Sequence, residues 1–157
     1  MSRYHSYINT ATEILQQYKG EEPLASFLKK FFSKHKKYGS KDRKQISHLC
    51  YCYFRIGRLK TNQPIEERLL LALFLCSGGQ NEILQQLRPE WMEVVHLSSL
   101  EKLLFLGLSS FQDIFPFPGE LSSDILKESF SLSHLTQPDL FLRLRPGREK
   151  AVKEKLT

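Results

Sequence analysis

Long apolar runs are missing from this chain of 157 residues. The longest, at positions 69–76, is far too short to span a bilayer, and the N-terminal residues contain no apolar core of the kind that a signal peptide needs. The three cysteines are an odd number at no spacing typical of a disulfide framework. We therefore expect a reduced, cytoplasmic protein with no membrane partner.

Signatures of enzyme chemistry are also missing. The pair Gly78-Gly79 follows a helical pattern, which is the wrong context for a phosphate or dinucleotide loop, and no Ser-His-Asp or paired-carboxylate set occurs. Cys50 and Cys52 would lie about 200° apart on a helix and could not share a metal. Cys76 and His35 fit a packed interior better than a reactive site. We expect the 157 residues of this chain to be non-catalytic and to hold no metal and no cofactor.

Acidic residues are scarce in one half of the chain. Residues 1–60 hold 13 Lys/Arg against 4 Asp/Glu, residues 61–135 hold 4 against 10, and residues 136–157 hold 6 against 3. Asp42 is the only acid in the stretch 29–58. Such asymmetry suggests a polyanion partner for the basic half. The alternative is a solvated helix face, although such a face normally mixes both signs.

Helical periodicity dominates the first 135 residues, and a hydrophobic content of 41% suits one compact domain. The fourth of the expected helices is rich in leucine and should be the most buried. Ser98 and Glu101 form a capping box at the start of the seventh. The expected helices are 3–19, 23–37, 40–59, 64–77, 81–87, 89–95, 98–106 and, roughly, 123–132.

The end of the chain has a different character. The segment "DLFLRLRP" alternates apolar and basic residues, which predicts a strand, and "GREKAVKEKL" predicts a following helix. A lone strand cannot stabilise itself. We therefore expect an all-α domain at 1–135, and at 136–157 a linker with the first strand and helix of an α+β subdomain whose remainder is missing. The alternative is a strand that packs on the helical domain as an edge.

The third expected helix places cations and aromatic rings on one side. Lys41, Lys44, His48, Tyr51, Arg55 and Arg58 follow one another at intervals of three and four residues, and apolar residues occupy the opposite side. Lysines of the second helix, together with the N-terminus of the third, should converge on the same surface, which is typical of phosphate binding. RNA is preferred to DNA because no helix-turn-helix spacing or zinc finger occurs. The candidate RNA-binding residues are Lys29, Lys30, Lys36, Lys37, Lys41, Arg43, Lys44, His48, Tyr51, Arg55 and Arg58.

Three segments resemble a known family. "YGSKDRKQISHLCYCYFRIGR" resembles the Tyr-Gly-x-x-Asp-Arg segment, with its later Tyr and Arg, in the N-terminal domain of Sun/Fmu-type RNA cytosine methyltransferases of the Nol–Nop–Sun family. "QPDLFLRLRPGREKAVKEKL" resembles the part of these proteins that leads into the catalytic half, and "DIFPFPGELS" lies between the two, as it does in related chains. The resemblance extends from about residue 3 to residue 157.

This resemblance implies a NusB-like fold, which is an all-α RNA-binding bundle, followed by the start of the subdomain that precedes a Rossmann methyltransferase. The full enzymes transfer a methyl group from S-adenosylmethionine to carbon 5 of a cytosine in ribosomal RNA. Neither the two catalytic cysteine motifs nor the methyl-donor loop of the family matches any part of this chain. By position, Asp42, Arg43 and Arg55 match the family segment; we interpret Asp42 as structural.

The first hypothesis is therefore a domain that docks ribosomal RNA for a cytosine-5 methyltransferase, with its own missing catalytic domain as partner. The second is a free-standing NusB-like regulator of transcription antitermination. The third is a protein-interaction module that uses the acidic middle of the chain, and the fourth is an enzyme in its own right.

Overall fold

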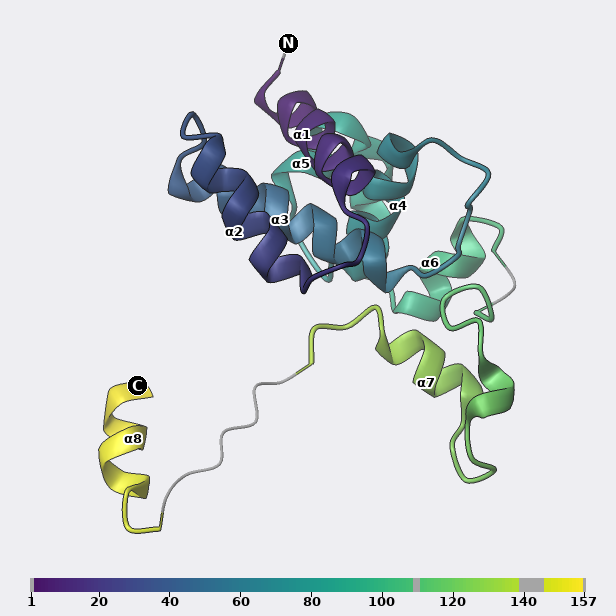
Figure 1. The fold of residues 1–157 in the computed structure, drawn as a ribbon. Helices are drawn as coiled ribbons and strands as arrows, with labels where there is room; N and C mark the ends of the chain where they lie inside the picture. Colours follow the sequence, from purple (N-terminus) through teal and green to yellow (C-terminus); the bar gives the residue numbers. More distant parts are fainter. Residues whose placement is uncertain (1, 109–110, 139–145, 157) are drawn as a thin grey trace.

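The computed structural model describes residues 2–108, 111–138 and 146–156. Within these ranges the secondary structure is entirely helical, which confirms the all-α class for the described residues. The strand expected from the alternating segment falls mainly on 139–145, outside the described residues. The α-helices are α1 Arg3–Gln17, α2 Leu24–Lys34, α3 Ser40–Arg55, α4 Ile65–Cys76, α5 Glu82–Leu87, α6 Ser99–Phe105, α7 Lys127–Ser133 and α8 Glu149–Leu156; two 3-10 helices, η1 Pro89–Val94 and η2 Pro118–Glu120, lie between them (Figure 1).

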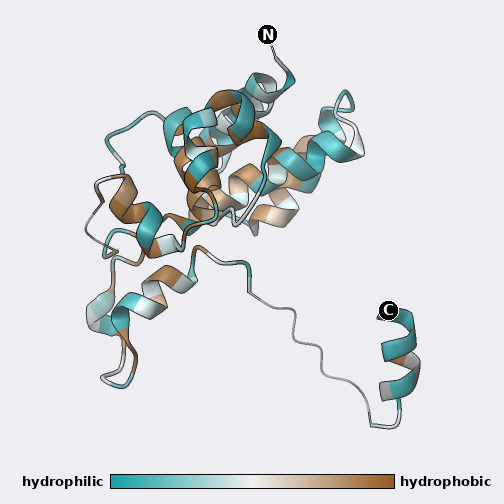
Figure 2. Ribbon diagram, turned by 180° about the vertical axis from the view of Figure 1, so that it is seen from behind, coloured by the Kyte–Doolittle hydropathy of each residue, from teal (hydrophilic) through white to brown (hydrophobic). Residues whose placement is uncertain are grey.

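Three of these helices form the centre of the body. α3 packs on both α1 and α4, and α1 also contacts α4 and α5 (Figure 1). Each residue of α4 from Arg68 to Leu75 is buried, which confirms that the leucine-rich helix lies in the core. Hydrophobic residues concentrate in the packed helices, whereas α8 is mostly hydrophilic (Figure 2). Among the helices of the described ranges, none has the length and apolar composition needed to cross a membrane.

The helices end earlier than periodicity predicts. α2 ends at Lys34 rather than residue 37, and α3 ends at Arg55 rather than residue 59. Gly57 follows α3 with a φ of 55°, which is left-handed backbone that favours glycine and stops the helix. α7 begins at Lys127 rather than near residue 123, and the segment at 89–94 is a 3-10 helix.

A buried arginine fixes the turn that follows α3. Arg68 of α4 donates from Nε to the Leu59 carbonyl at 3.0 Å and from Nη2 to the Gly57 carbonyl at 2.8 Å. Its Nη1 donates to the hydroxyl of Tyr53, and the guanidinium lies 4.5 Å from the centre of that ring. The turn therefore has one fixed path, which leads the chain away from the axis of α3.

α6 is tied to the end of α4 by a buried lysine. Ser98 and Glu101 form the expected capping box, with 2.8 Å between the Ser98 amide and the Glu101 carboxylate. One residue later, Lys102 is 2% exposed and donates to the carbonyls of Phe74, at 3.2 Å, and of Ser77. The Phe74 carbonyl also accepts from the Ser77 amide, at 3.3 Å, so the lysine adds a second donor at the end of α4, where carbonyls run out of intrahelical partners. The lysine therefore has a structural role.

Candidate nucleic-acid interface

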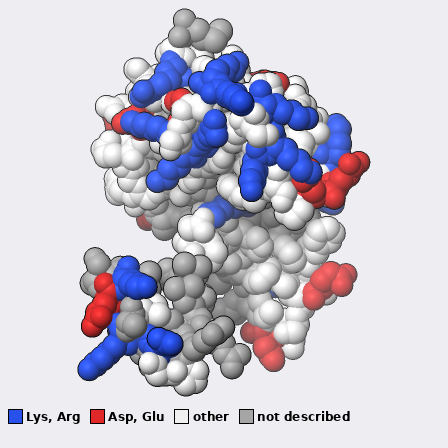
Figure 3. Space-filling model, turned by 60° about the vertical axis from the view of Figure 1, so that its left-hand side comes forward, with Lys and Arg blue, Asp and Glu red and all other residues white. Residues whose placement is uncertain are grey.

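Lysine and arginine side chains gather on the side of the helical body where α2 lies, with few acidic residues among them (Figure 3). We use the name basic surface for the exposed lysines of α2, of the turn after it and of the first turns of α3. These are Lys29, Lys30, Lys34, Lys36, Lys37, Lys41 and Lys44. Lys30 forms a salt bridge of 2.9 Å with Glu22, and within the described part of the chain the other six form none. Six ammonium groups without a carboxylate partner give this surface its positive potential.

The turn between α2 and α3 is anchored from inside. The Tyr38 side chain is buried, and its hydroxyl lies 2.9 Å from the hydroxyl of Thr10 in α1. Arg43 donates from Nε to the Tyr38 carbonyl at 2.8 Å, and its guanidinium lies 5.9 Å from the centre of the Phe32 ring. The half-buried Arg43 therefore holds the turn, and its Nε is not free for the RNA contact expected from the sequence.

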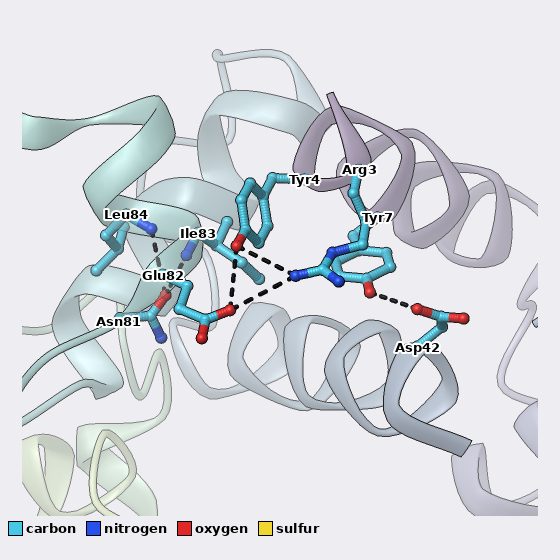
Figure 4. A network of polar contacts seen from close by, with 8 residues as sticks. All are labelled: Arg3, Tyr4, Tyr7, Asp42, Asn81, Glu82, Ile83 and Leu84. Carbon is cyan, nitrogen blue, oxygen red and sulfur yellow. Dashed lines mark hydrogen bonds and ion pairs between the residues drawn. The ribbon is translucent and has the colours of Figure 1, made fainter. Parts of the chain in front are cut away.

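Asp42 has the structural role expected from the sequence. Its carboxylate accepts a hydrogen bond from the Gly39 amide at 2.9 Å. It also accepts one from the Tyr7 hydroxyl of α1 (Figure 4). These two bonds, with the Tyr7 bond the larger cause, hold the pKa of Asp42 below its usual value. Gly39 is the N-cap of α3. Because a carboxylate already occupies the start of α3, the basic surface does not depend on a free helix terminus.

The stripe predicted along α3 is present only in part. Lys41, Lys44, His48 and Tyr51 are exposed, whereas Ile46, Leu49 and Cys50 on the other side are fully buried. The half-buried Arg55 donates to the side-chain carbonyl of Gln137, so the segment after α7 partly covers it. Arg58 lies beyond the end of α3, where it contacts the Phe117 ring at 5.6 Å. The sequence prediction placed Arg58 on the helix because it extended α3 past Gly57.

The histidine of the stripe lies beside a buried thiol. Nε2 of His48 is 3.6 Å from Sγ of Cys52, which is buried. Desolvation by the surrounding atoms lowers the pKa of His48, and the positive charges of Arg55 and Lys44 lower it further. Burial raises the pKa of Cys50 to about 12, so its thiol stays protonated at neutral pH. Among the described residues, no group of three or more His, Cys, Asp or Glu side chains is placed to hold a metal ion.

A hollow of about 490 Å³ opens beside the exposed side of α3. It is lined by Lys44, Gln45, Ser47, His48, Tyr51 and Asn81. A second hollow, of about 240 Å³, shares Gln45 and Asn81 with the first and extends toward Arg3 and Lys41. Gln45, Ser47 and Asn81 are not among the site residues predicted from the sequence. Gln45 and Ser47 could have been noticed beside the stripe, but Asn81 joins them only through the packing of α5.

A polar network holds the start of α5, which forms one wall of both hollows (Figure 4). The Tyr4 hydroxyl donates to Glu82 at 3.0 Å, and Arg3 lies 3.7 Å from the same carboxylate. The side-chain oxygen of Asn81 accepts from the amides of Ile83 and Leu84 at 3.0 and 3.2 Å, which caps α5. The first turn of α1 thus fixes the start of α5 against α3.

Comparisons of the chain with models of protein families, with curated proteins and with solved structures found no match. The NusB-like fold and the resemblance to RNA methyltransferases therefore stay predictions.

Proposed function

We propose that the helical domain at 1–135 binds RNA through its basic surface. The observation that supports this most directly is the set of exposed lysines without carboxylate partners, in a stretch where Asp42 is the only acid and is itself bound by Tyr7 and Gly39. Phosphate groups are the complementary partners of such a surface. RNA is preferred to DNA because the described helices show no helix-turn-helix spacing.

The resemblance adds a more specific proposal. The domain would dock ribosomal RNA so that a catalytic domain, absent from this chain, reaches one cytosine and methylates carbon 5. S-adenosylmethionine would supply the methyl group in that domain. The hollows lined by residues 58–62, by Arg3 and Lys41, and by Lys44 and Tyr51 contain no glycine-rich turn between a strand and a helix, so these described residues do not fit this cofactor.

Fluorescence anisotropy with a labelled ribosomal RNA hairpin tests the RNA-binding proposal. Reversing three exposed lysines in Lys36→Glu/Lys41→Glu/Lys44→Glu should weaken binding by more than roughly tenfold, because each loses a phosphate contact and adds a repulsive charge. Lys127→Glu in α7, also exposed, is the control and should bind almost as the unchanged protein does. Far-UV circular dichroism should show the same helix content in all variants.

RNA binding and methyl transfer together separate the alternative functions. A free-standing NusB-like regulator would also bind RNA, and methyl transfer after fusion to a catalytic domain would distinguish it from the methyltransferase proposal. Unchanged protein that does not bind RNA would contradict both and favour a protein-interaction module.

A further inference from the structure

The side chains that line the hollow beside α3 can form hydrogen bonds with the edge of a flat ligand and stack on its face, which a simple charged surface cannot do. Within the described residues, the side chains of Gln45, Ser47 and Tyr51 make no hydrogen bond to other residues, although all three line the hollow. The side-chain oxygen of Asn81 is committed to the cap of α5, so its NH₂ group is the part left to serve a ligand (Figure 4). Donors and acceptors from three kinds of side chain therefore meet in one place.

Two flat rings lie in the same hollow. His48 and Tyr51 are three positions apart on α3, so they are neighbours on one face of the helix, and both are exposed. The tyrosine is 41% exposed, although large aromatic side chains are usually buried more deeply. Exposed rings beside cations are the usual platform for unpaired bases, because every base has a π face.

The lysines at the rim of the hollow favour a ligand that carries a negative charge. Lys44 lines the hollow and Lys41 lies one turn earlier on α3, while no acidic residue lines it. An occupant therefore needs a flat aromatic face, a hydrogen-bonding edge and an adjoining phosphate. A nucleotide combines these three features, and its base can enter only if it is neither paired nor stacked within a duplex.

We propose that this hollow accepts one unpaired base of a bound RNA. The base stacks on Tyr51 and His48, its edge meets the amides of Gln45 and Asn81, and the adjoining phosphates contact Lys41 and Lys44. This inference rests on the proposed RNA-binding function and narrows its ligand to single-stranded or looped RNA.

The backbone of α3 and the Asn81 amide are held in place before a ligand binds. α3 is anchored by fully buried side chains on its other side, and the cap of α5 fixes the orientation of the Asn81 amide. A site that is ordered before its ligand arrives loses little conformational entropy on binding.

The test compares two labelled ligands with the same charge. One is a uridine decamer, and the other is a decamer of sugar-phosphate residues without bases. We expect the unchanged protein to bind the uridine decamer about five- to a hundredfold more tightly, which corresponds to stacking of one base. A labelled RNA duplex, whose bases are paired, should bind the unchanged protein and Tyr51→Leu equally well.

Single substitutions test whether the preference for the uridine decamer arises in this hollow. Tyr51→Leu and Gln45→Ala should each reduce the preference for the uridine decamer toward unity, with little change in binding of the base-free decamer. Asn81→Ser retains an oxygen that can cap α5 and should reduce the preference without unfolding the domain. Lys36→Glu, on the basic surface outside the hollow, should weaken binding of both decamers by the same factor.

Equal binding of the two decamers by the unchanged protein would overturn the inference while leaving the RNA-binding proposal in place. A preference that persists in Tyr51→Leu and Gln45→Ala would overturn it as well, because the base would then bind elsewhere. Binding to neither decamer nor to the duplex would contradict the proposed function and this inference together.

Discussion

At the scale of single residues, the buried guanidinium of Arg68 holds the turn after α3. It is 7% exposed and donates to three acceptors in and after α3. We expect Arg68→Met to lower the free energy of unfolding by about 3 kcal/mol, because the Gly57 and Leu59 carbonyls lose their partner. Urea denaturation followed by circular dichroism measures this loss.

Arg88→Met is the matched control. Arg88 lies 2.6 Å from Glu67, but both side chains are partly exposed. Such a pair should contribute less than about 1 kcal/mol. Similar losses for the two variants would show that Arg68 does not hold the turn.

The lowered pKa of His48 predicts a dependence of stability on pH. The unfolded state takes up the proton near the usual pKa of 6.5, whereas the folded state takes it up only at lower pH. Stability should therefore fall as the pH decreases from 6.5 toward the folded-state pKa. We expect the urea midpoint of the unchanged protein to fall more, between neutral pH and about pH 5.5, than that of His48→Gln. Equal decreases of the urea midpoint in the two proteins would show that protonation of His48 does not cause the loss of stability.

Residue by residue, helical periodicity was enough to predict that Lys41, Lys44 and Tyr51 are exposed. It could not predict that Arg55 meets Gln137, because that contact depends on how a distant segment packs. For the same reason Asn81 was missed, although its role as an N-cap follows from its residue type.

At the scale of elements, the turn after α3 depends on Gly57. A Cβ atom at this position would lie 2.2 Å from the Ile114 carbonyl oxygen, in addition to the cost of a φ of 55°. We expect Gly57→Ala to lower the free energy of unfolding by at least about 3 kcal/mol, because backbone must move. Chemical denaturation again provides the measurement.

A substitution at Gly20 separates the cost of a positive φ from the cost of a steric clash. Its φ is 80°, but a Cβ atom there would meet nothing within 4 Å. Gly20→Ala should therefore cost only the backbone strain, about 1–2 kcal/mol. If both variants lost the same amount, the close approach to Ile114 would have no energetic role.

The order of the α-helices was predictable, because the apolar spacing of the first 135 residues is regular, but the 3-10 type of the segment at 89–94 was not. The ends of α2 and α3 were not, since apolar residues continue past them: Ile56 and Leu59 are buried in the turn rather than on a helix. A helix, α8, lies in the tail, but the strand expected before it falls outside the described residues, so the strand-helix unit stays a prediction.

At the scale of the whole molecule, charge is divided between the two halves of the helical domain. The sequence predicted this division from composition, and the basic residues do gather on one side of the body (Figure 3). Composition could not predict which cations have partners. Arg43, Arg55 and Arg58 contact other parts of the chain, so the lysines are left as the main phosphate contacts.

The most direct test of RNA binding by the basic surface is the salt dependence of affinity for a labelled single-stranded RNA. With roughly five phosphates neutralised, the logarithm of the association constant should fall with the logarithm of KCl concentration at a slope of about −3.5. In Lys36→Glu/Lys41→Glu/Lys44→Glu the slope should become shallower by about two. A flat response in the unchanged protein, or the same slope in both proteins, would contradict the account.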